Sequence, residues 1–131
     1  QTCILSTKGN KLGHLVLRGG GGKPNYDSES VAKAVENMIK RDINPALVVD
    51  CSHANSNKDH TRQPIVLEDV LKQRKEGQDA IRGVMLESNI GPGNQSILEN
   101  LEDMLYGVSV TDKCLDWPTT EKILKEAHSR V

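Results

Sequence analysis

The sequence contains no phenylalanine, and only one tryptophan and two tyrosines among its 131 residues. A packed core therefore has to be built from aliphatic side chains, and the hydrophobic content of 36% is sufficient for one layer of strands with covering helices. No apolar run approaches the ~20 residues that cross a bilayer, so we expect no membrane segment. The 17 basic and 18 acidic side chains are well mixed, so we expect neither nucleic acid nor a membrane surface as a partner.

Cysteine is also scarce. Cys3, Cys51 and Cys114 are odd in number and unrelated in spacing, which argues against a disulfide framework. Reduced thiols in a cytosolic protein are the simpler interpretation, with Cys51 as a small buried hydrophobe at the end of an apolar run. The chain begins at Gln1, without a methionine or a signal peptide, as if it had been cut from a longer protein.

Short apolar runs at residues 14–17, 46–49 and 81–86 predict strands that are covered on both faces. An earlier run, residues 2–6, is predicted as a further strand or as one arm of a hairpin. The turn after it would use Gly9 and Asn10.

Helices are predicted between and after these strands, over residues 28–41, 63–76 and 118–130. Asp27 or Ser28 suits the N-cap of the first helix, and Pro64 and Gly77 suit the start and stop of the second. Each helix carries an apolar stripe, made of Val31, Ala34, Val35, Met38 and Ile39 in the first, Leu67, Val70 and Leu71 in the second, and Ile123, Leu124 and Ala127 in the third.

The alternation of strands and helices predicts an α/β fold with a parallel sheet. Its closed form is the eight-stranded (β/α)8 barrel, which needs ~250 residues, and this chain has about half of that. The periodicity therefore favours either an open sheet or part of a barrel, and it does not choose between them.

Polar groups follow each predicted strand, at the end where parallel α/β folds bind ligands. Arg18 and the glycines at 19–22 follow the first strand, His53 the second and Glu87 the third, and Asp112 comes later in the motif SVTDKC. Alone, each has an ordinary structural explanation, such as a surface ion pair, a tight turn or a helix cap. The run RGGGGKP also fails the Walker pattern, because Pro24 follows Lys23 and no helix starts there.

Together these residues indicate a site. One imidazole and two carboxylates at successive strand ends can form a mixed nitrogen and oxygen site for a divalent metal. A guanidinium beside flexible glycines suits a phosphate or a carboxylate. The combination slightly favours an enzyme that acts on a phosphorylated or carboxylated metabolite.

Several motifs resemble the type I 3-deoxy-D-arabino-heptulosonate 7-phosphate (DAHP) synthases, in order along nearly the whole chain. They are LRGG at 17–20, PNYD at 24–27, VDCSHANSNKD at 49–59, RQP at 62–64, GVMLESNI at 83–90, GNQS at 93–96 and YGVSVTDKCLDW at 106–117. The resemblance implies that residues 1–131 are the C-terminal portion of one (β/α)8 barrel whose N-terminal half is absent from this chain.

The resemblance also implies an activity, the first step of the shikimate pathway, in which phosphoenolpyruvate condenses with erythrose 4-phosphate and phosphate is released. It implies a divalent metal, such as Mn, Fe, Co or Zn, held by His53, Glu87 and Asp112 together with a cysteine. Arg18 would grip the phosphate of phosphoenolpyruvate, His53 could also handle water or a substrate oxygen, and Asp112 could touch erythrose 4-phosphate. The second ring nitrogen of His53 should be held by a neighbour.

The chain departs from the family pattern because several of the family's site residues have no counterpart in it. The cysteine of the metal site, the KPRT segment and further cationic residues lie upstream in the family and have no match here. We therefore expect the isolated chain to be inactive, and to form a homo-oligomer or to depend on its missing half. Two alternatives remain, a related metal-dependent aldolase or 3-deoxy-sugar acid synthase, and a catalytically inactive half-barrel that serves as a binding or assembly module.

Overall fold

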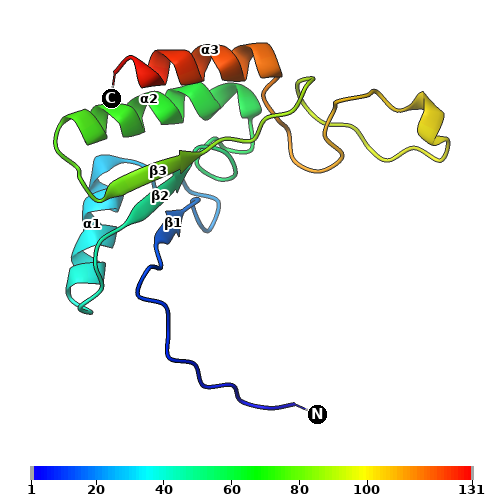
Figure 1. The fold of residues 1–131 in the computed structure, drawn as a ribbon. Coiled ribbons are helices and arrows are strands. Elements are labelled where there is room, and N and C mark those ends of the chain that lie inside the picture. Colours follow the sequence, from blue (N-terminus) through cyan, green and yellow to red (C-terminus); the bar gives the residue numbers. More distant parts are fainter. Residues whose placement is uncertain (1, 131) are drawn as a thin grey trace.

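The computed structural model describes residues 2–130 and has one parallel sheet of three strands (Figure 1). The strands are β1 (Leu15–Leu17), β2 (Leu47–Asp50) and β3 (Ile81–Met85), in the spatial order β1-β2-β3. Their registers place all three carboxyl ends at one edge, since Leu17 pairs with Val49 and Asp50 pairs with Met85. The predicted α/β fold with a parallel sheet is confirmed.

Three helices connect and follow the strands: α1 (Ser28–Ile39), α2 (Gln63–Lys75) and α3 (Trp117–His128). Asp27 caps α1 by accepting a hydrogen bond from the Ser30 amide, and Asp116 caps α3 by accepting one from the Thr119 amide. Proline in the first turn of α2 and of α3 costs no hydrogen bond, because those amides have no partner inside a helix. Short 3-10 turns lie at η1 (His60–Arg62) and η2 (Leu101–Asp103).

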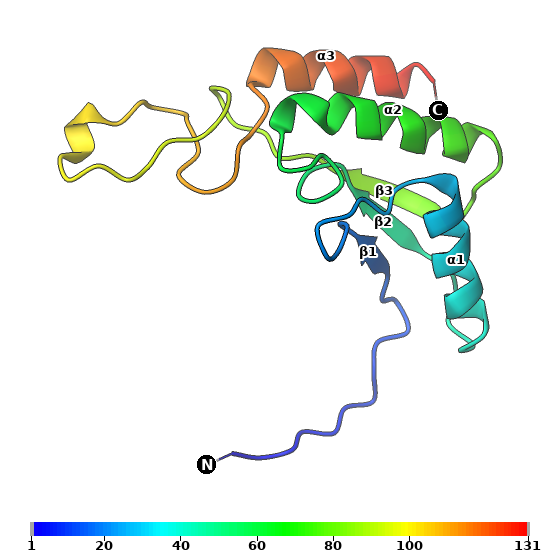
Figure 2. The same ribbon diagram turned by 180° about the vertical axis from the view of Figure 1, so that it is seen from behind.

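The core is aliphatic and lies between the sheet and its helices, with α2 and α3 side by side in Figures 1 and 2. The predicted stripes contribute to it: five of their eleven residues are buried, including Val31, Val70 and Ile123, and four more are partly buried against it. Ile39 and Leu124 were wrongly placed in the stripes, because they are 61% and 45% exposed. Each directly follows a buried residue of its helix, Met38 or Ile123, and successive helical side chains are about 100° apart, so both turn away from the core.

The prediction of a strand or hairpin arm at residues 2–6 is wrong. The segment before β1 has no regular structure and extends away from the sheet (Figure 1), with Ile4 fully exposed. A strand needs a neighbour to accept its hydrogen bonds, and nothing in the described part of the chain lies beside this segment. The turn in it is closed by the Gly13 amide, which donates to the Asn10 carbonyl.

A long excursion, residues 88–116, separates β3 from α3 and projects from one end of the molecule (Figure 2). We call it the arm. Isolated bridges between Gly93 and Cys114 and between Asn94 and Ser109 join its outgoing and returning halves. Its returning half is tied back to the end of β3, since the Leu115 amide donates to the Glu87 carbonyl at 2.9 Å. The arm thereby carries Asp112 back to the sheet edge.

Among the described residues, no helix has both the length and the apolar character to cross a bilayer.

Candidate metal and substrate site

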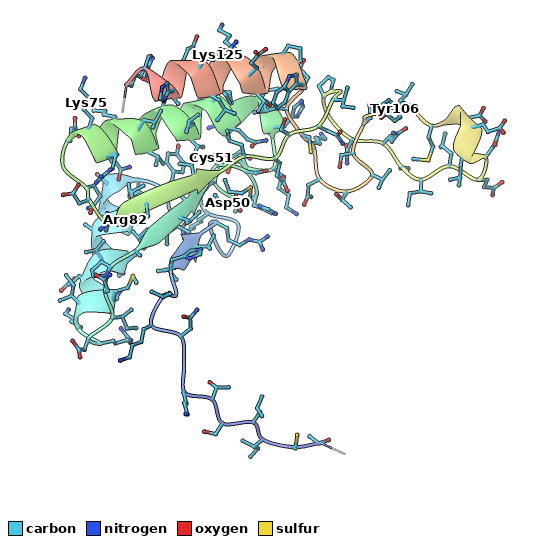
Figure 3. The ribbon with its side chains drawn as sticks, viewed as in Figure 1. Asp50, Cys51, Lys75, Arg82, Tyr106 and Lys125 are labelled. Carbon is cyan, nitrogen blue, oxygen red and sulfur yellow. The ribbon has the colours of Figure 1, made fainter. Side chains whose placement is uncertain are left out.

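The loop after β2 holds His53 in a defined orientation. His53 has a positive φ of 42°, which turns the chain sharply three residues beyond the strand. Its Nδ1 lies 2.6 Å from Oδ2 of Asp50, and the other oxygen of Asp50 accepts the Ser52 amide at 2.8 Å. Asp50 is only 2% exposed (its position at the strand end is labelled in Figure 3), so water does not compete for its oxygens. This arrangement leaves Nε2 as the nitrogen that faces the sheet edge.

Glu87, two residues beyond β3, is held at both its backbone and its side chain. The buried amide of Gln63, at the start of α2, accepts from the Glu87 amide at 2.8 Å and donates to its carbonyl at 3.1 Å. The Ser52 hydroxyl donates to Oε2 of Glu87 at 2.5 Å. The other carboxylate oxygen, Oε1, lies 3.7 Å from Nε2 of His53.

Asp112 completes a group of three. Its Oδ2 is also 3.7 Å from Nε2 of His53, and one ligand atom from each of His53, Glu87 and Asp112 lies within 4.8 Å of the others. Two ligands bound at about 2.1 Å to one ion lie roughly 3 to 3.5 Å apart, so a small closure around an ion would suffice. A cation between the two carboxylates would also offset their repulsion. The residues therefore fit a divalent metal in both donor type and spacing.

Arg18 lies next to this group, in a cleft of ≈ 420 Å³. Among residues 2–130 it makes no ion pair, so its guanidinium is free to bind an anion. The glycines 19–22 and the side chains of His53, Lys58 and Asp112 form the rest of the cleft wall, together with Ala54. The structure thus brings all four predicted site residues to one end of the sheet.

The glycine loop approaches the β2 loop closely. Gly19 has φ +77°, and a Cβ placed on it would lie 2.6 Å from Cβ of Ala54. Gly20 and Lys23 exchange two backbone hydrogen bonds of 3.0 Å, which close a small hairpin. No helix starts there, as predicted, because α1 begins at Ser28. The loop is therefore shaped by close packing rather than by a helix N-terminus.

No cysteine belongs to the group formed by His53, Glu87 and Asp112, although the Cys114 thiol donates to the Asp112 carbonyl at 3.6 Å. Cys51 is fully buried as predicted, and its burial, with a smaller contribution from Asp50, raises the pKa of its thiol to about 12. Burial also raises the pKa of Cys114. All three cysteines are free. Cys51 packs in the hydrophobic core and is not part of the group of ligand atoms.

Several residues of the site had no role in the sequence analysis. Asp50 and Ser52 form hydrogen bonds with the side chains of His53 and Glu87. Gln63 forms hydrogen bonds with the backbone of Glu87, and Asn55 joins the loops after β1 and β2. Lys58 lines the cleft. A dense polar run directly after a buried strand was the available signal for four of them. Gln63 gave no signal, because a glutamine at the start of a helix is unremarkable until its partner is known.

The parallel α/β unit places an imidazole, two carboxylates and a guanidinium at the carboxyl edge of its sheet, which is the edge where parallel α/β enzymes bind their ligands. The comparisons with known proteins specify the family. Residues 1–125 match the model of the DAHP synthetase I family, and the chain belongs to this family.

Over the matched 128 residues, two curated relatives are about half identical to this chain. The Tyr-sensitive phospho-2-dehydro-3-deoxyheptonate aldolase of Enterobacter agglomerans is 52% identical over 128 residues, which is 98% of this chain and 60% of that protein. The Escherichia coli K12 enzyme of the same name is 49% identical, and the match covers 98% of this chain and 36% of that enzyme.

A solved structure has the same fold. The phospho-2-dehydro-3-deoxyheptonate aldolase of Francisella tularensis superposes with a TM-score of 0.88 at 46% identity, over 98% of this chain and 37% of that one. The three strands and three helices are thus part of a barrel fold, as predicted. The chain spans between about a third and three fifths of the lengths of these relatives.

Proposed function

We propose that this chain is the C-terminal part of a DAHP synthase barrel, and that the whole protein condenses phosphoenolpyruvate with erythrose 4-phosphate to give DAHP and phosphate. The observation that carries the proposal is the approach of His53, Glu87 and Asp112 beside the Arg18 cleft, in a chain of this family. The names of the relatives support the reaction, since they describe phospho-2-dehydro-3-deoxyheptonate aldolases.

Each residue has a distinct role in this proposal. His53, Glu87 and Asp112 hold a divalent cation, which supplies Lewis-acid polarisation of a carbonyl oxygen when bound. Arg18 binds the phosphate of phosphoenolpyruvate through its planar donors and offsets the dianion's charge. Asp112, on the open side of the group with 59% of its side chain exposed, also accepts a hydrogen bond from erythrose 4-phosphate. His53 lines the cleft as well and orients a water or a substrate oxygen there.

Metal binding tests this function. We expect Mn²⁺ to bind the full protein that carries this sequence, and His53→Ala, Glu87→Gln and Asp112→Asn each to weaken binding by at least tenfold. Arg18→Ala should keep the metal and raise KM for phosphoenolpyruvate, because it removes an anion clamp. The exposed Glu102→Gln, on η2 of the arm, is the matched control for loss of one carboxylate.

The alternative is an inactive half-barrel that serves as a binding or assembly module, and the exposed apolar side chains of the sheet, Leu15, Val16 and Val84, are the observation that favours it. Unchanged metal affinity in the three ligand variants would reject the proposed metal centre. Synthase activity in the full protein that is abolished by His53→Ala would exclude the inactive module.

A further inference from the structure

We propose that Asp50 and Ser52 are positioning residues that select the ligand atoms of the metal centre, Nε2 of His53 and Oε1 of Glu87. This inference rests on the proposed function, because it concerns the same centre. It goes further by assigning atoms and by naming two residues that contact neither metal nor substrate. The assignment of the two ligand atoms and the roles of Asp50 and Ser52 follow from hydrogen bonds at the end of β2.

Asp50 determines which nitrogen of His53 is free to bind a metal. A carboxylate only accepts hydrogen bonds, and Oδ2 of Asp50 is 2.6 Å from Nδ1, so Nδ1 has to carry the proton. The neutral ring then has its lone pair on Nε2, which points at Glu87 and Asp112. Asp50 cannot turn away, because its other oxygen holds the Ser52 amide and the side chain is buried.

Ser52 determines which oxygen of Glu87 faces the centre. Its hydroxyl donates to Oε2 at 2.5 Å, and Oε1 is the oxygen near Nε2 of His53. Ser52 is 4% exposed, so its hydroxyl is not shared with bulk water. The hydrogen bond favours binding of the metal through one oxygen of Glu87.

The two residues also join the ligands to each other. A chain of hydrogen bonds runs from Glu87 through the Ser52 hydroxyl, then from the Ser52 amide through Asp50 to His53. It links the loops after β2 and β3, which are 35 residues apart at Ser52 and Glu87. Loss of either link releases a ligand from its orientation before any metal arrives, which is a cost in affinity.

The first test is the tautomer of His53 in the metal-free, full protein that carries this sequence. Two-dimensional ¹H–¹⁵N NMR distinguishes a protonated from an unprotonated ring nitrogen. We expect the neutral ring to carry its proton on Nδ1 alone. In the neutral ring, a proton on Nε2 alone, or an even mixture of the two tautomers, would overturn the assignment. This readout needs neither metal nor activity, and it uses the wild type, so it does not depend on a variant that folds.

The second test is Mn²⁺ affinity, followed by the EPR signal of the free ion. Asp50→Asn offers a donor to Nδ1 and should shift the ring proton to Nε2, and Ser52→Ala frees Oε2. Each should weaken Mn²⁺ binding by about 10- to 100-fold. The controls are Asp59→Asn, an exposed carboxylate of the same loop, and Ser129→Ala, whose hydroxyl at the end of α3 donates to the Glu126 carbonyl.

The outcomes separate the two proposals. Affinities within twofold of wild type in both Asp50→Asn and Ser52→Ala would refute the positioning role while the metal centre stands. If wild type shows the expected tautomer but binds no Mn²⁺, the proposed function fails and Asp50 still orients His53.

Discussion

Asn55 and Gly19 bring the loops after β1 and β2 into contact. The buried amide of Asn55 donates to the carbonyls of Leu17 and Asp50, at 3.0 and 2.8 Å, and accepts the Asn25 amide at 2.8 Å. The Gly19 amide in turn donates to the side chain of Asn25 at 2.7 Å. Arg18 lies between these anchored residues, so its position in the cleft depends on them.

Gly19→Ala should destabilise the protein by roughly 2 kcal/mol or more, and it should raise KM for phosphoenolpyruvate. A methyl group there meets Ala54 at 2.6 Å and the Lys23 carbonyl at 2.8 Å, in a backbone conformation that alanine rarely adopts. Urea unfolding and steady-state kinetics measure the two effects.

Two neighbouring glycines are matched controls for this substitution. Gly22→Ala adds only the backbone strain, because its φ is +74° and nothing lies near the new methyl group. Gly20→Ala adds neither strain nor a clash. We expect Gly20→Ala to be the most stable of the three variants, Gly22→Ala to be intermediate and Gly19→Ala to be the least stable. Equal losses in the free energy of unfolding in all three would contradict the packing argument.

At the scale of elements, side-chain caps decide where the helices begin. Asp27 accepts hydrogen bonds from the backbone amide and the hydroxyl of Ser30, at 2.9 and 2.7 Å. These bonds, the amide first, lower the pKa of the Asp27 carboxyl below its usual range. Because the carboxylate form is favoured on folding, the stabilisation is present above the unfolded pKa near 3.8 and is lost as the pH falls through the lower, folded pKa.

Asp27→Ala should lower the free energy of unfolding by about 1 kcal/mol at neutral pH, since it removes the cap of α1. Asp27→Asn should retain most of that stability, because asparagine caps helices equally well. The advantage of wild type over Asp27→Ala should shrink as the pH is lowered below about 4. Chemical unfolding at several pH values measures this, and a pH-independent difference would rule out a charged cap.

At the scale of the whole molecule, both edges of the sheet are unpaired within residues 2–130. β1 and β3 each have one strand neighbour among the described residues, and Leu15, Val16 and Val84 are 40%, 45% and 36% exposed. Two larger clefts, of ≈ 460 and ≈ 590 Å³, flank β1 and α1, and Leu15, Met38 and Ile43 lie in the walls of both. They lie away from the ligand group, so volume alone does not identify the chemical site here. Unpaired strand edges beside apolar surface favour association.

The 131-residue chain on its own should therefore be catalytically inactive and should form oligomers rather than a 14.4 kDa monomer. Light scattering during size-exclusion chromatography measures the mass directly. Val16→Lys should reduce association, because it places a charge on the exposed sheet face. The exposed Lys33→Glu, a charge change on α1, should leave the mass unchanged. A monomer that unfolds cooperatively, or turnover of both substrates by this chain, would refute the expectation.

The element pattern could be read from the sequence, because it depends on local periodicity. Apolar runs and amphipathic stripes predicted the three strands and three helices to within a few residues, and Asp27 and Pro64 marked helix starts. The segment at residues 2–6 was predicted wrongly for the opposite reason. Its apolar residues can form a strand only beside a neighbour, and local sequence carries no information about that neighbour.

The sequence by itself determined the α/β class, the family resemblance and the four polar residues that follow the strands. These depend on residue type and order along the chain. Only the tertiary structure decided which atoms meet. His53 and Asp112 are 59 positions apart, and their 3.7 Å separation results from the strand register and from the return of the arm to β3. Asp50, Ser52 and Gln63 gained their roles in the same way, since a hydrogen bond between distant loops exists only after the sheet aligns the strand ends.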